Sequence, residues 1–254
     1  MEIKAKKSFG QNFLINKKIQ NKIIDSSNIE NEDVIEIGPG LGALTNLLIN
    51  KVKSLVAYEL DKEIYEMWIS KNLGQKIKFI NQDFLEANLY SIDKRVVVGN
   101  IPYNITSPIL FKLIENKQYI KSATIMIQKE VGDRLIAKPN NKSYSKLTVS
   151  LQSVANVQKI LIAKSSDFNP APKVDSMVVK IDFNIDIDFE LEKYLDFIKR
   201  CFQFKRKTLM NNLITSYDKD KLLKVFQKNQ INLLSRPESL EIKQYISLFK
   251  DLVI

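Results

Sequence analysis

The stretch that decides the fold is residues 33–42, which read Asp33-Val34-Ile35-Glu36-Ile37-Gly38-Pro39-Gly40-Leu41-Gly42. Its first half is a short apolar run of the kind that forms a buried strand. Its second half holds three of the seven glycines of the chain, and a helical pattern follows from Ala43 to about Lys51. Such a loop lets backbone approach a nucleoside at a helix N-terminus, although a plain tight turn explains a glycine triplet equally well.

The alternation of strand and helix continues along the chain. Short apolar runs predict further strands at residues 54–60, 76–81, 95–99 and 123–128. Between them, Asp61 is a suitable N-cap for one helix, and a second helix is expected from Pro108 to about Asn116. Alternation of this kind produces a parallel sheet with helices on both faces. We therefore expect an α/β fold with a Rossmann-like, doubly wound sheet.

The pattern changes after Lys180. An acidic alternation occupies residues 182–188, and helical patterns follow at 190–204, 219–228 and 238–250. The boundary is expected near residue 183, so that residues 1–183 form the α/β domain and residues 184–254 form a small helical domain.

Composition excludes several kinds of chemistry. The 254 residues include no histidine and one cysteine, Cys201. A disulfide framework, a cysteine zinc site and any nucleophile activated by histidine are therefore excluded, and no metal site is expected. The absence of a long apolar run or a signal peptide, together with the lone cysteine, predicts a soluble cytoplasmic protein without a membrane partner.

Charge is concentrated in blocks. The chain carries 39 basic and 29 acidic residues, a net charge of +10, which suggests a polyanionic partner such as nucleic acid. Residues 1–22, 108–181 and 197–236 are basic, whereas residues 23–66 are acidic. Candidate RNA contacts in the first and last of these basic blocks are Lys6, Lys7, Lys205, Arg206 and Lys207. Solvated surface lysines are the alternative reading of such runs.

Two acidic residues follow the second and third predicted strands. Glu59 closes the second strand about twenty residues after the glycine loop of Gly38 and Gly40, where a carboxylate can accept both hydroxyls of a ribose. Asp83 follows the third strand and can accept from an adenine amino group. Solvated acids would explain either residue alone. A nicotinamide-binding fold shares the glycine loop and the first acid, so these features do not identify the cofactor.

The fourth strand separates these possibilities. It runs into Asn100-Ile101-Pro102-Tyr103 at the edge where a parallel sheet binds its ligands. If the Asn100 side-chain oxygen and the Ile101 carbonyl accept the N–H groups of adenine N6, the nitrogen lone pair is freed for attack on a methyl group. Pro102 stiffens the turn, and Tyr103 is expected to stack on the target base. This chemistry requires no histidine base.

Motifs along almost the whole chain then resemble one family. They are residues 7–14, 36–45, 59–61, 82–83, 99–108, 128–131, 168–176, 205–209, 211–213 and 236–240. In this order they are similar to the ribosomal RNA adenine N6,N6-dimethyltransferases of the KsgA type. The resemblance implies transfer of methyl groups from S-adenosylmethionine to two adjacent adenosines in the 3′-terminal hairpin of small-subunit ribosomal RNA, each becoming dimethylated.

The resemblance also implies roles for individual residues. Asn12 and Leu14 are expected to fold over S-adenosylmethionine, Gly38 to contact it, and Glu59, Asp83 and Asn100 to bind its ribose, adenine and methionine ends. Phe168 is expected to stack on the target adenine opposite Tyr103, with a place in the core as the alternative for Phe168. The small ribosomal subunit is the expected partner and a monomer the expected state.

Three other functions are compatible with parts of the pattern. They are a large-subunit ribosomal RNA adenine methyltransferase that confers antibiotic resistance, a non-catalytic RNA-binding factor in ribosome assembly, and a nicotinamide-dependent oxidoreductase. The intact Asn100-to-Tyr103 motif disfavours the second and third. The Phe9-to-Leu14 motif and the matches beyond residue 183 favour the small-subunit enzyme over the first.

Overall fold

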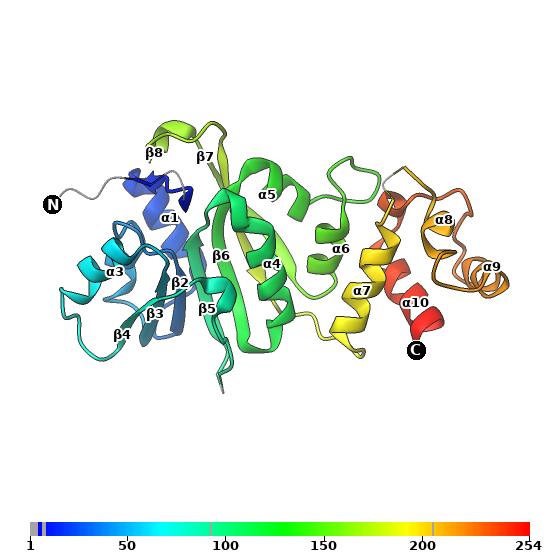
Figure 1. Cartoon of the computed structure of the whole chain (residues 1–254), viewed down its shortest axis with the longest axis horizontal. Helices are drawn as coiled ribbons and strands as arrows, with labels where there is room; N and C mark the ends of the chain where they lie inside the picture. The colour runs from blue at the N-terminus through cyan, green and yellow to red at the C-terminus, as the bar shows by residue number, and fades with distance from the viewer. Residues whose placement is uncertain (1–4, 7–8, 92, 205) are drawn as a thin grey trace. The chain divides into compact units, whose positions relative to one another are not determined.

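A seven-stranded sheet organises the first part of the molecule in the computed structural model, which describes residues 5–6, 9–91, 93–204 and 206–254 (Figure 1). The strand order is β4-β3-β2-β5-β6-β9-β7. The strands are β2 (Asp33–Ile37), β3 (Ser54–Glu59), β4 (Ile77–Asn81), β5 (Arg95–Asn100), β6 (Ile120–Gln128), β7 (Asn156–Ala163) and β9 (Ser176–Asp182). A separate two-stranded sheet joins β1 (Phe13–Leu14) to β8 (Phe168–Asn169).

The five strands expected from the sequence are all present and run parallel to one another. The fold class is thereby confirmed. The structure adds β7 and β9, which the sequence interpretation did not include, and β9 runs antiparallel to both β6 and β7. β9 lies between β6 and the edge strand β7, so the sheet is mixed, as is common in large sheets.

The chain changes direction across the sheet beside β2. From β2 it proceeds outward through β3 and β4, and it then returns to place β5 on the other side of β2. Ligands of open α/β sheets bind at the carboxyl ends of strands at such a switch point. Gly99 permits close strand contact there, because a Cβ atom at this position would lie 2.9 Å from the Ile37 carbonyl oxygen. The glycine loop after β2 and the motif after β5 therefore begin side by side.

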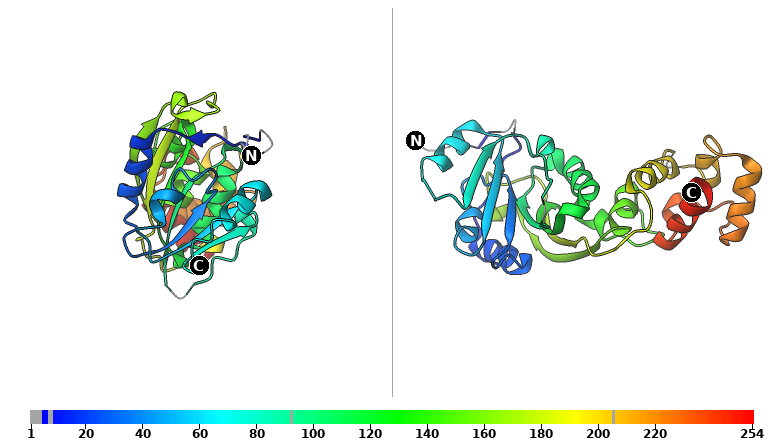
Figure 2. Two further views of the ribbon diagram at one scale, coloured as in Figure 1. Left: turned by 90° about the vertical axis from the view of Figure 1, so that its left-hand side faces the viewer. Right: turned by 90° about the horizontal axis from the view of Figure 1, so that it is seen from below.

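Helices cover both faces of this sheet. The helices of this part are α1 (Lys17–Ser27), α2 (Thr45–Leu48), α3 (Lys62–Ile69), α4 (Thr106–Glu115) and the start of α5 (Lys129–Leu135). Ile23 of α1 and Leu48 of α2 are fully buried in one cluster with Val96 and Val98 of β5, each contributing about 1.5–3 kcal/mol by burial. Figure 2 shows α4 on the opposite face from α1. The expected cap is confirmed, since the Asp61 side chain accepts a hydrogen bond from the Glu63 amide at the start of α3.

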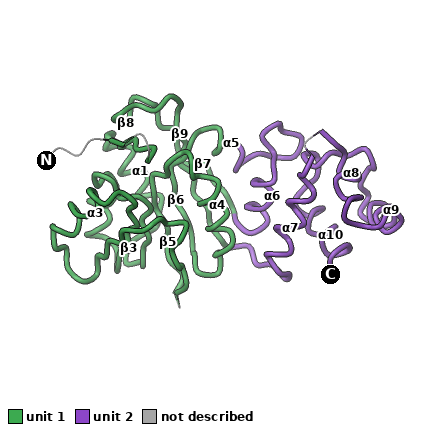
Figure 3. Tube along the Cα trace, viewed as in Figure 1, with its two compact units in different colours: residues 1–132, 156–183 green, residues 133–155, 184–254 purple. Residues whose placement is uncertain are grey.

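Figure 3 divides the chain into two units, residues 1–132 with 156–183 and residues 133–155 with 184–254. The sequence interpretation expected one boundary near residue 183 and kept residues 133–155 in the first domain. The structure differs because apolar side chains of this segment, including Tyr144 and Val149, are buried in the core of the helical unit. The chain therefore enters the second unit twice, first with residues 133–155 and again from residue 184.

The second unit is helical, as expected. Its helices are α6 (Lys146–Gln152), α7 (Leu191–Cys201), α8 (Leu209–Leu213), α9 (Lys219–Lys228) and α10 (Ile242–Val253). Aromatic rings fill its centre: the rings of Tyr194 and Phe249, for example, meet edge to face at 5.3 Å. The last helix begins later than the expected residue 238 because Glu241 and Gln244 form a capping box there. Within the described ranges, no helix is long and apolar enough to cross a membrane.

Candidate active site

The glycine loop after β2 forms the floor of the main pocket. Gly38 and Gly40 have φ values of +69° and +51°, in the left-handed region that favours glycine. A Cβ atom at Gly38 would meet no atom within 4 Å, so this backbone faces open space in the pocket. Gly42 differs, since a Cβ atom there would lie 2.8 Å from the Trp68 ring. Gly38 and Gly40 therefore shape the pocket, whereas Gly42 allows helix packing.

Glu59 lies at the end of β3 beside this loop. Its Oε2 accepts a hydrogen bond from the Gly40 amide at 3.2 Å, and its Oε1 accepts one from the Asp61 amide at 2.9 Å. Burial raises the pKa of the Glu59 carboxyl, and these two backbone amides oppose the rise. Each carboxylate oxygen can accept more than one hydrogen bond. Glu59 therefore orders the loop and retains acceptor capacity for two ligand hydroxyls.

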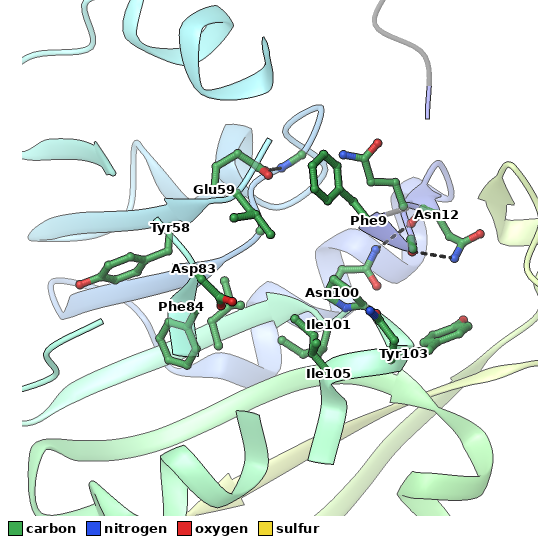
Figure 4. Close-up of a pocket in the computed structure, with 18 of the residues that line it drawn as sticks. Phe9, Asn12, Tyr58, Glu59, Asp83, Phe84, Asn100, Ile101, Tyr103 and Ile105 are labelled. Atoms are coloured by element: carbon green, nitrogen blue, oxygen red, sulfur yellow. Dashed lines mark hydrogen bonds between the residues drawn. The ribbon is translucent and has the colours of Figure 1, made fainter. Parts of the chain in front are cut away.

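Asp83 lies beyond the end of β4, on the neighbouring wall of the pocket (Figure 4). Its Oδ1 caps the short helix η2 (Phe84–Glu86) by accepting from the Leu85 amide at 2.8 Å. Phe84 packs edge to face on Tyr58 with ring centroids 5.6 Å apart, and Leu60 adds an exposed apolar side chain to the pocket lining. A carboxylate acceptor beside apolar walls fits an adenine ring and its amino group.

Asn100 ends β5 with its side-chain amide in a defined orientation. The Asn100 Nδ2 donates to the Asn12 carbonyl oxygen at 2.9 Å (Figure 4). The Nδ2 of Asn100 is thereby bonded to the Asn12 carbonyl, and the Oδ1 of the same amide faces away from Asn12. In the same turn, the Ile101 amide donates to the Met126 carbonyl at 2.9 Å, which ties the motif to β6. The site thus presents an oriented amide oxygen at the switch point.

Tyr103 is anchored at its hydroxyl. It lies in η3 (Tyr103–Ile105), and its OH is 2.6 Å from the Ser176 Oγ of β9. Burial raises the pKa of the Tyr103 hydroxyl, so it stays neutral at physiological pH. The ring lines the pocket together with Pro102. The sequence interpretation included Ser176 only as the end of the motif 168–176 and gave it no role, because β9 was not among its expected strands.

The N-terminal segment Phe9–Phe13 forms the remaining wall of the pocket, next to the strand ends of the switch point. It reaches this place because β1 pairs with β8, with Phe13 opposite Asn169 and Leu14 opposite Phe168. Asn12 lines the pocket, as expected for a residue that covers the cofactor. Leu14 instead is 3% exposed in the hydrophobic core and borders only a neighbouring cavity.

Phe168 occupies a position that differs from its expected stacking role. Its side chain is 4% exposed and packs in the cluster that includes Leu14 and Ile19. It is not part of the pocket lining in the described residues. The alternative left open by the sequence, a place in the core, describes this conformation. The reason is the pairing of β8 with β1, which the sequence did not reveal.

The neighbouring cavity contains a buried carboxyl without a complete set of partners. Glu36 Oε1 accepts from the Thr45 Oγ at 3.0 Å, whereas its Oε2 is buried and has no hydrogen-bond partner among the described residues. Burial raises the pKa of Glu36 to about 8. The cavity lies along the glycine loop and reaches Asn100. An unsatisfied carboxyl oxygen there fits a cationic or N–H donor group of a ligand.

The expected RNA contacts fall in different environments. Lys6 Nζ forms ion pairs with Asp61 at 2.7 Å and with Glu63 at 3.0 Å, and these hydrogen bonds raise the pKa of Lys6. The Lys6 ammonium group is therefore paired with carboxylates of this chain, whereas the sequence interpretation expected it to contact RNA. Arg206 and Lys207 are exposed. The predictions for Lys7 and Lys205 lie outside the described residues.

A buried asparagine holds the loop that carries Arg206 and Lys207. Asn212 Oδ1 accepts from the Phe204 amide at 2.7 Å, and its Nδ2 donates to the Thr208 carbonyl at 3.0 Å. Asn212 is fully buried, so both ends of its amide need partners inside the unit. Asn212 thus links the backbone of Phe204 to that of Thr208, and the side chains of Arg206 and Lys207 between them are in solvent.

The pocket defines the class of protein. The pocket lining brings together the Gly38 backbone, the Glu59 and Asp83 carboxylates and the Asn100 side-chain amide at the carboxyl ends of the strands. On a Rossmann-like sheet this combination defines an S-adenosylmethionine-dependent methyltransferase. The chain belongs to the ribosomal RNA adenine dimethylase family, whose sequence model matches residues 2–253.

Individual relatives cover the whole chain. The chain is 49% identical to ribosomal RNA small subunit methyltransferase A of Metamycoplasma arthritidis, over 100% of this chain and 98% of the relative. It is 46% identical to the protein of the same name from Mycoplasma mobile, over 97% and 98% of the two chains. Among solved structures, it resembles a dimethyladenosine transferase from Plasmodium falciparum with a TM-score of 0.82, 27% identity and coverage of 94% and 96%. The 23S rRNA methyltransferase ErmE gives a TM-score of 0.74 at 25% identity, over 95% and 99% of the chains.

Proposed function

We propose that this enzyme transfers methyl groups from S-adenosylmethionine to N6 of two adjacent adenosines in the 3′-terminal hairpin of small-subunit (16S) ribosomal RNA, dimethylating each during biogenesis of the small subunit. Its setting is the cytoplasm, and it acts as a monomer on the subunit. The observation that carries the proposal is the oriented Asn100 amide next to a nucleoside pocket.

The cofactor is held by groups on three strand ends. Glu59 accepts from the ribose hydroxyls, Asp83 accepts from the adenine amino group, and the Gly38 and Gly40 backbone allows close approach. Asn12 covers the bound cofactor, and Glu36 offers its unsatisfied oxygen to the amino-acid end. When bound, S-adenosylmethionine supplies an electrophilic methyl group on a sulfonium.

The target adenine is held by the motif after β5. Asn100 Oδ1 and the Ile101 carbonyl accept the two N6–H groups and draw the nitrogen toward tetrahedral geometry, so that its lone pair is directed at the methyl group. The same oxygens stabilise the positive charge that grows on N6. The N6 proton becomes acidic only after transfer and leaves to solvent. Tyr103, fixed by Ser176, provides a face for the unstacked base.

The helical unit supplies contacts to phosphates. Arg206 and Lys207 lie between Phe204 and Thr208, whose backbone groups Asn212 binds, and Lys205 precedes them in the sequence. Phosphate contacts of this kind give affinity and register and carry little sequence information. Specificity for the two adenosines then comes from the shape of the folded subunit RNA.

The test is methylation of purified, unmethylated ribosomal subunits with labelled S-adenosylmethionine, followed by mapping of the modified nucleotides. Label in two adjacent adenosines of the 16S 3′-terminal hairpin supports the proposal. Label in large-subunit RNA would favour the activity named for ErmE, with which the chain shares its fold. Binding to the small subunit without any transfer would favour a non-catalytic assembly factor.

A further inference from the structure

We propose that Gln11 and Asp61 are positioning residues for methyl transfer. They fix the N-terminal segment Phe9–Phe13 so that the Asn12 carbonyl holds the Asn100 amide in its active orientation. This inference rests on the proposed function of Asn100. It assigns to two residues, one of which (Gln11) lines the pocket, a role that acts through Asn12.

The side chain of Gln11 connects two parts of the chain. Its Oε1 accepts from the Lys6 backbone amide at 2.7 Å, and its Nε2 donates to Asp61 Oδ2 at 3.0 Å. Both ends of the amide are therefore engaged. An interaction that uses donor and acceptor together fixes the direction of the side chain and, with it, the path of the backbone toward Asn12.

Asp61 is a charged group that is almost completely buried. Its side chain is 2% exposed, and it accepts from Lys6 Nζ at 2.7 Å and from the Glu63 amide at 3.1 Å in addition to Gln11. Burial favours the neutral acid, but the hydrogen bonds from Lys6, Gln11 and Glu63 outweigh it and lower the pKa of Asp61. The carboxylate is thus ionised at neutral pH and needs these donors, so the segment cannot leave without exposing it.

The Gln11–Asp61 contact is next in the chain to Asn12, the residue whose carbonyl orients Asn100. The Asn12 carbonyl follows Gln11 directly and accepts the Asn100 Nδ2 at 2.9 Å. If this carbonyl moves away, the Asn100 amide can rotate and turn its NH₂ group toward the target. Adenine N6 carries donors of its own in the ground state, so that orientation brings donors together and removes an acceptor from the transition state. The segment therefore controls the fraction of molecules with an active Asn100.

Asp61 also contacts Glu59, which lines the pocket on the proposed cofactor side. Its backbone amide donates to Glu59 Oε1 at 2.9 Å, and this bond does not depend on the Asp61 side chain. Substitution of the side chain can therefore release the N-terminal segment while the Glu59 carboxylate keeps its backbone donors. This separation predicts a larger effect on kcat than on the KM for S-adenosylmethionine.

The experiment compares Gln11→Leu and Asp61→Asn with Glu63→Gln. Asparagine is as good a helix N-cap as aspartate, so Asp61→Asn retains the start of α3. Glu63→Gln is the matched control, because it removes the exposed partner of Lys6 and leaves the Gln11–Asp61 contact. For each protein, kcat and KM are measured with unmethylated small subunits at varied S-adenosylmethionine, with Tm and cofactor Kd recorded separately.

We expect kcat to fall at least about tenfold in Gln11→Leu and Asp61→Asn, with KM and Kd for the cofactor within about threefold and Tm unchanged, whereas Glu63→Gln stays at the wild-type rate. Wild-type kcat in both variants, or a loss confined to KM or Tm, would overturn the positioning role alone. A wild-type protein that methylates neither subunit would instead refute the proposed function, and this inference with it.

Discussion

Substitution of Asn100 by alanine tests the proposed chemistry most directly. The change removes the Oδ1 acceptor and the hydrogen bond of Nδ2 to the Asn12 carbonyl, which is 2.9 Å long. Asn100 is half-buried at the end of β5, and the main-chain bonds of its strand remain. We therefore expect a folded protein whose free energy of unfolding falls by no more than about 0.5–1.5 kcal/mol, the net value of one hydrogen bond.

The loss in the chemical step is expected to be larger. One oriented acceptor of transition-state charge in a site shielded from water contributes about 2.7–4 kcal/mol, or about a hundredfold to a thousandfold in rate. The cofactor loses only one of several contacts, so its Kd is expected to rise less than about tenfold. Asn100→Ala should thus abolish detectable multiple turnover and leave most of the cofactor affinity.

The assay is single-turnover transfer of labelled methyl groups to unmethylated small subunits at saturating cofactor, with Kd measured by calorimetry. Asn88→Ala serves as the control, because Asn88 is an exposed asparagine whose Oδ1 accepts only from the nearby Tyr90 amide in the described contacts. A transfer rate for Asn100→Ala within about threefold of wild type would refute the acceptor mechanism, since less than 1 kcal/mol would then depend on this side chain.

Four further outcomes are expected. Glu59→Ala should raise the Kd for S-adenosylmethionine about tenfold or more, because the ribose acceptor and the loop contact to the Gly40 amide are lost together; unchanged affinity would reject the assignment. Neutralising Lys205, Arg206 and Lys207 should reduce the salt dependence of subunit binding by up to about 0.7–0.9 per lost phosphate contact, and an unaltered slope would leave them as solvated side chains. Glu36→Gln should lessen the pH dependence of stability: the folded carboxyl holds its proton to about pH 8 and the unfolded one releases it near 4.5, so the wild-type free energy of unfolding falls as pH rises through this window. Equal pH profiles in thermal unfolding would contradict the burial of a neutral Glu36. Chelators should leave transfer to folded subunits unchanged, and a loss reversed by added metal would show that a metal is needed.

Local patterns were sufficient for the five parallel strands β2–β6 and for the order of the motifs. Residues 33–37 form β2 with the expected bounds, and Asp61 caps the helix that was placed after it. These features depend on apolar periodicity and on hydrogen bonds between neighbours in the chain, which a sequence shows directly. The same patterns placed Gly38, Glu59, Asp83 and Asn100 at the ends of parallel strands, and the pocket brings these four together.

Contacts between residues far apart in the sequence could not be predicted from local patterns. Phe168 was expected to stack on the base, but its strand pairs with Leu14 and places the ring in the core. Lys6 was expected to contact RNA, but its Nζ pairs with Asp61, a residue read only as a helix cap. Gln11 lies within the motif 7–14 but was given no role. The sequence of a loop does not show which groups the two ends of a glutamine amide will bind, here the Lys6 amide and the Asp61 carboxylate.

The sequence by itself determined the five parallel strands, the glycine loop and the chemical identity of the groups around the pocket, because strand ends and turns are set by residues close together in the chain. Only the tertiary structure decided which way Asn100 points, since that depends on the carbonyl of Asn12, 88 residues earlier. It also decided that residues 133–155 join the helical unit. The physical reason is the same in both cases: a side-chain amide or an apolar face is compatible with many partners, and packing of the whole chain selects one.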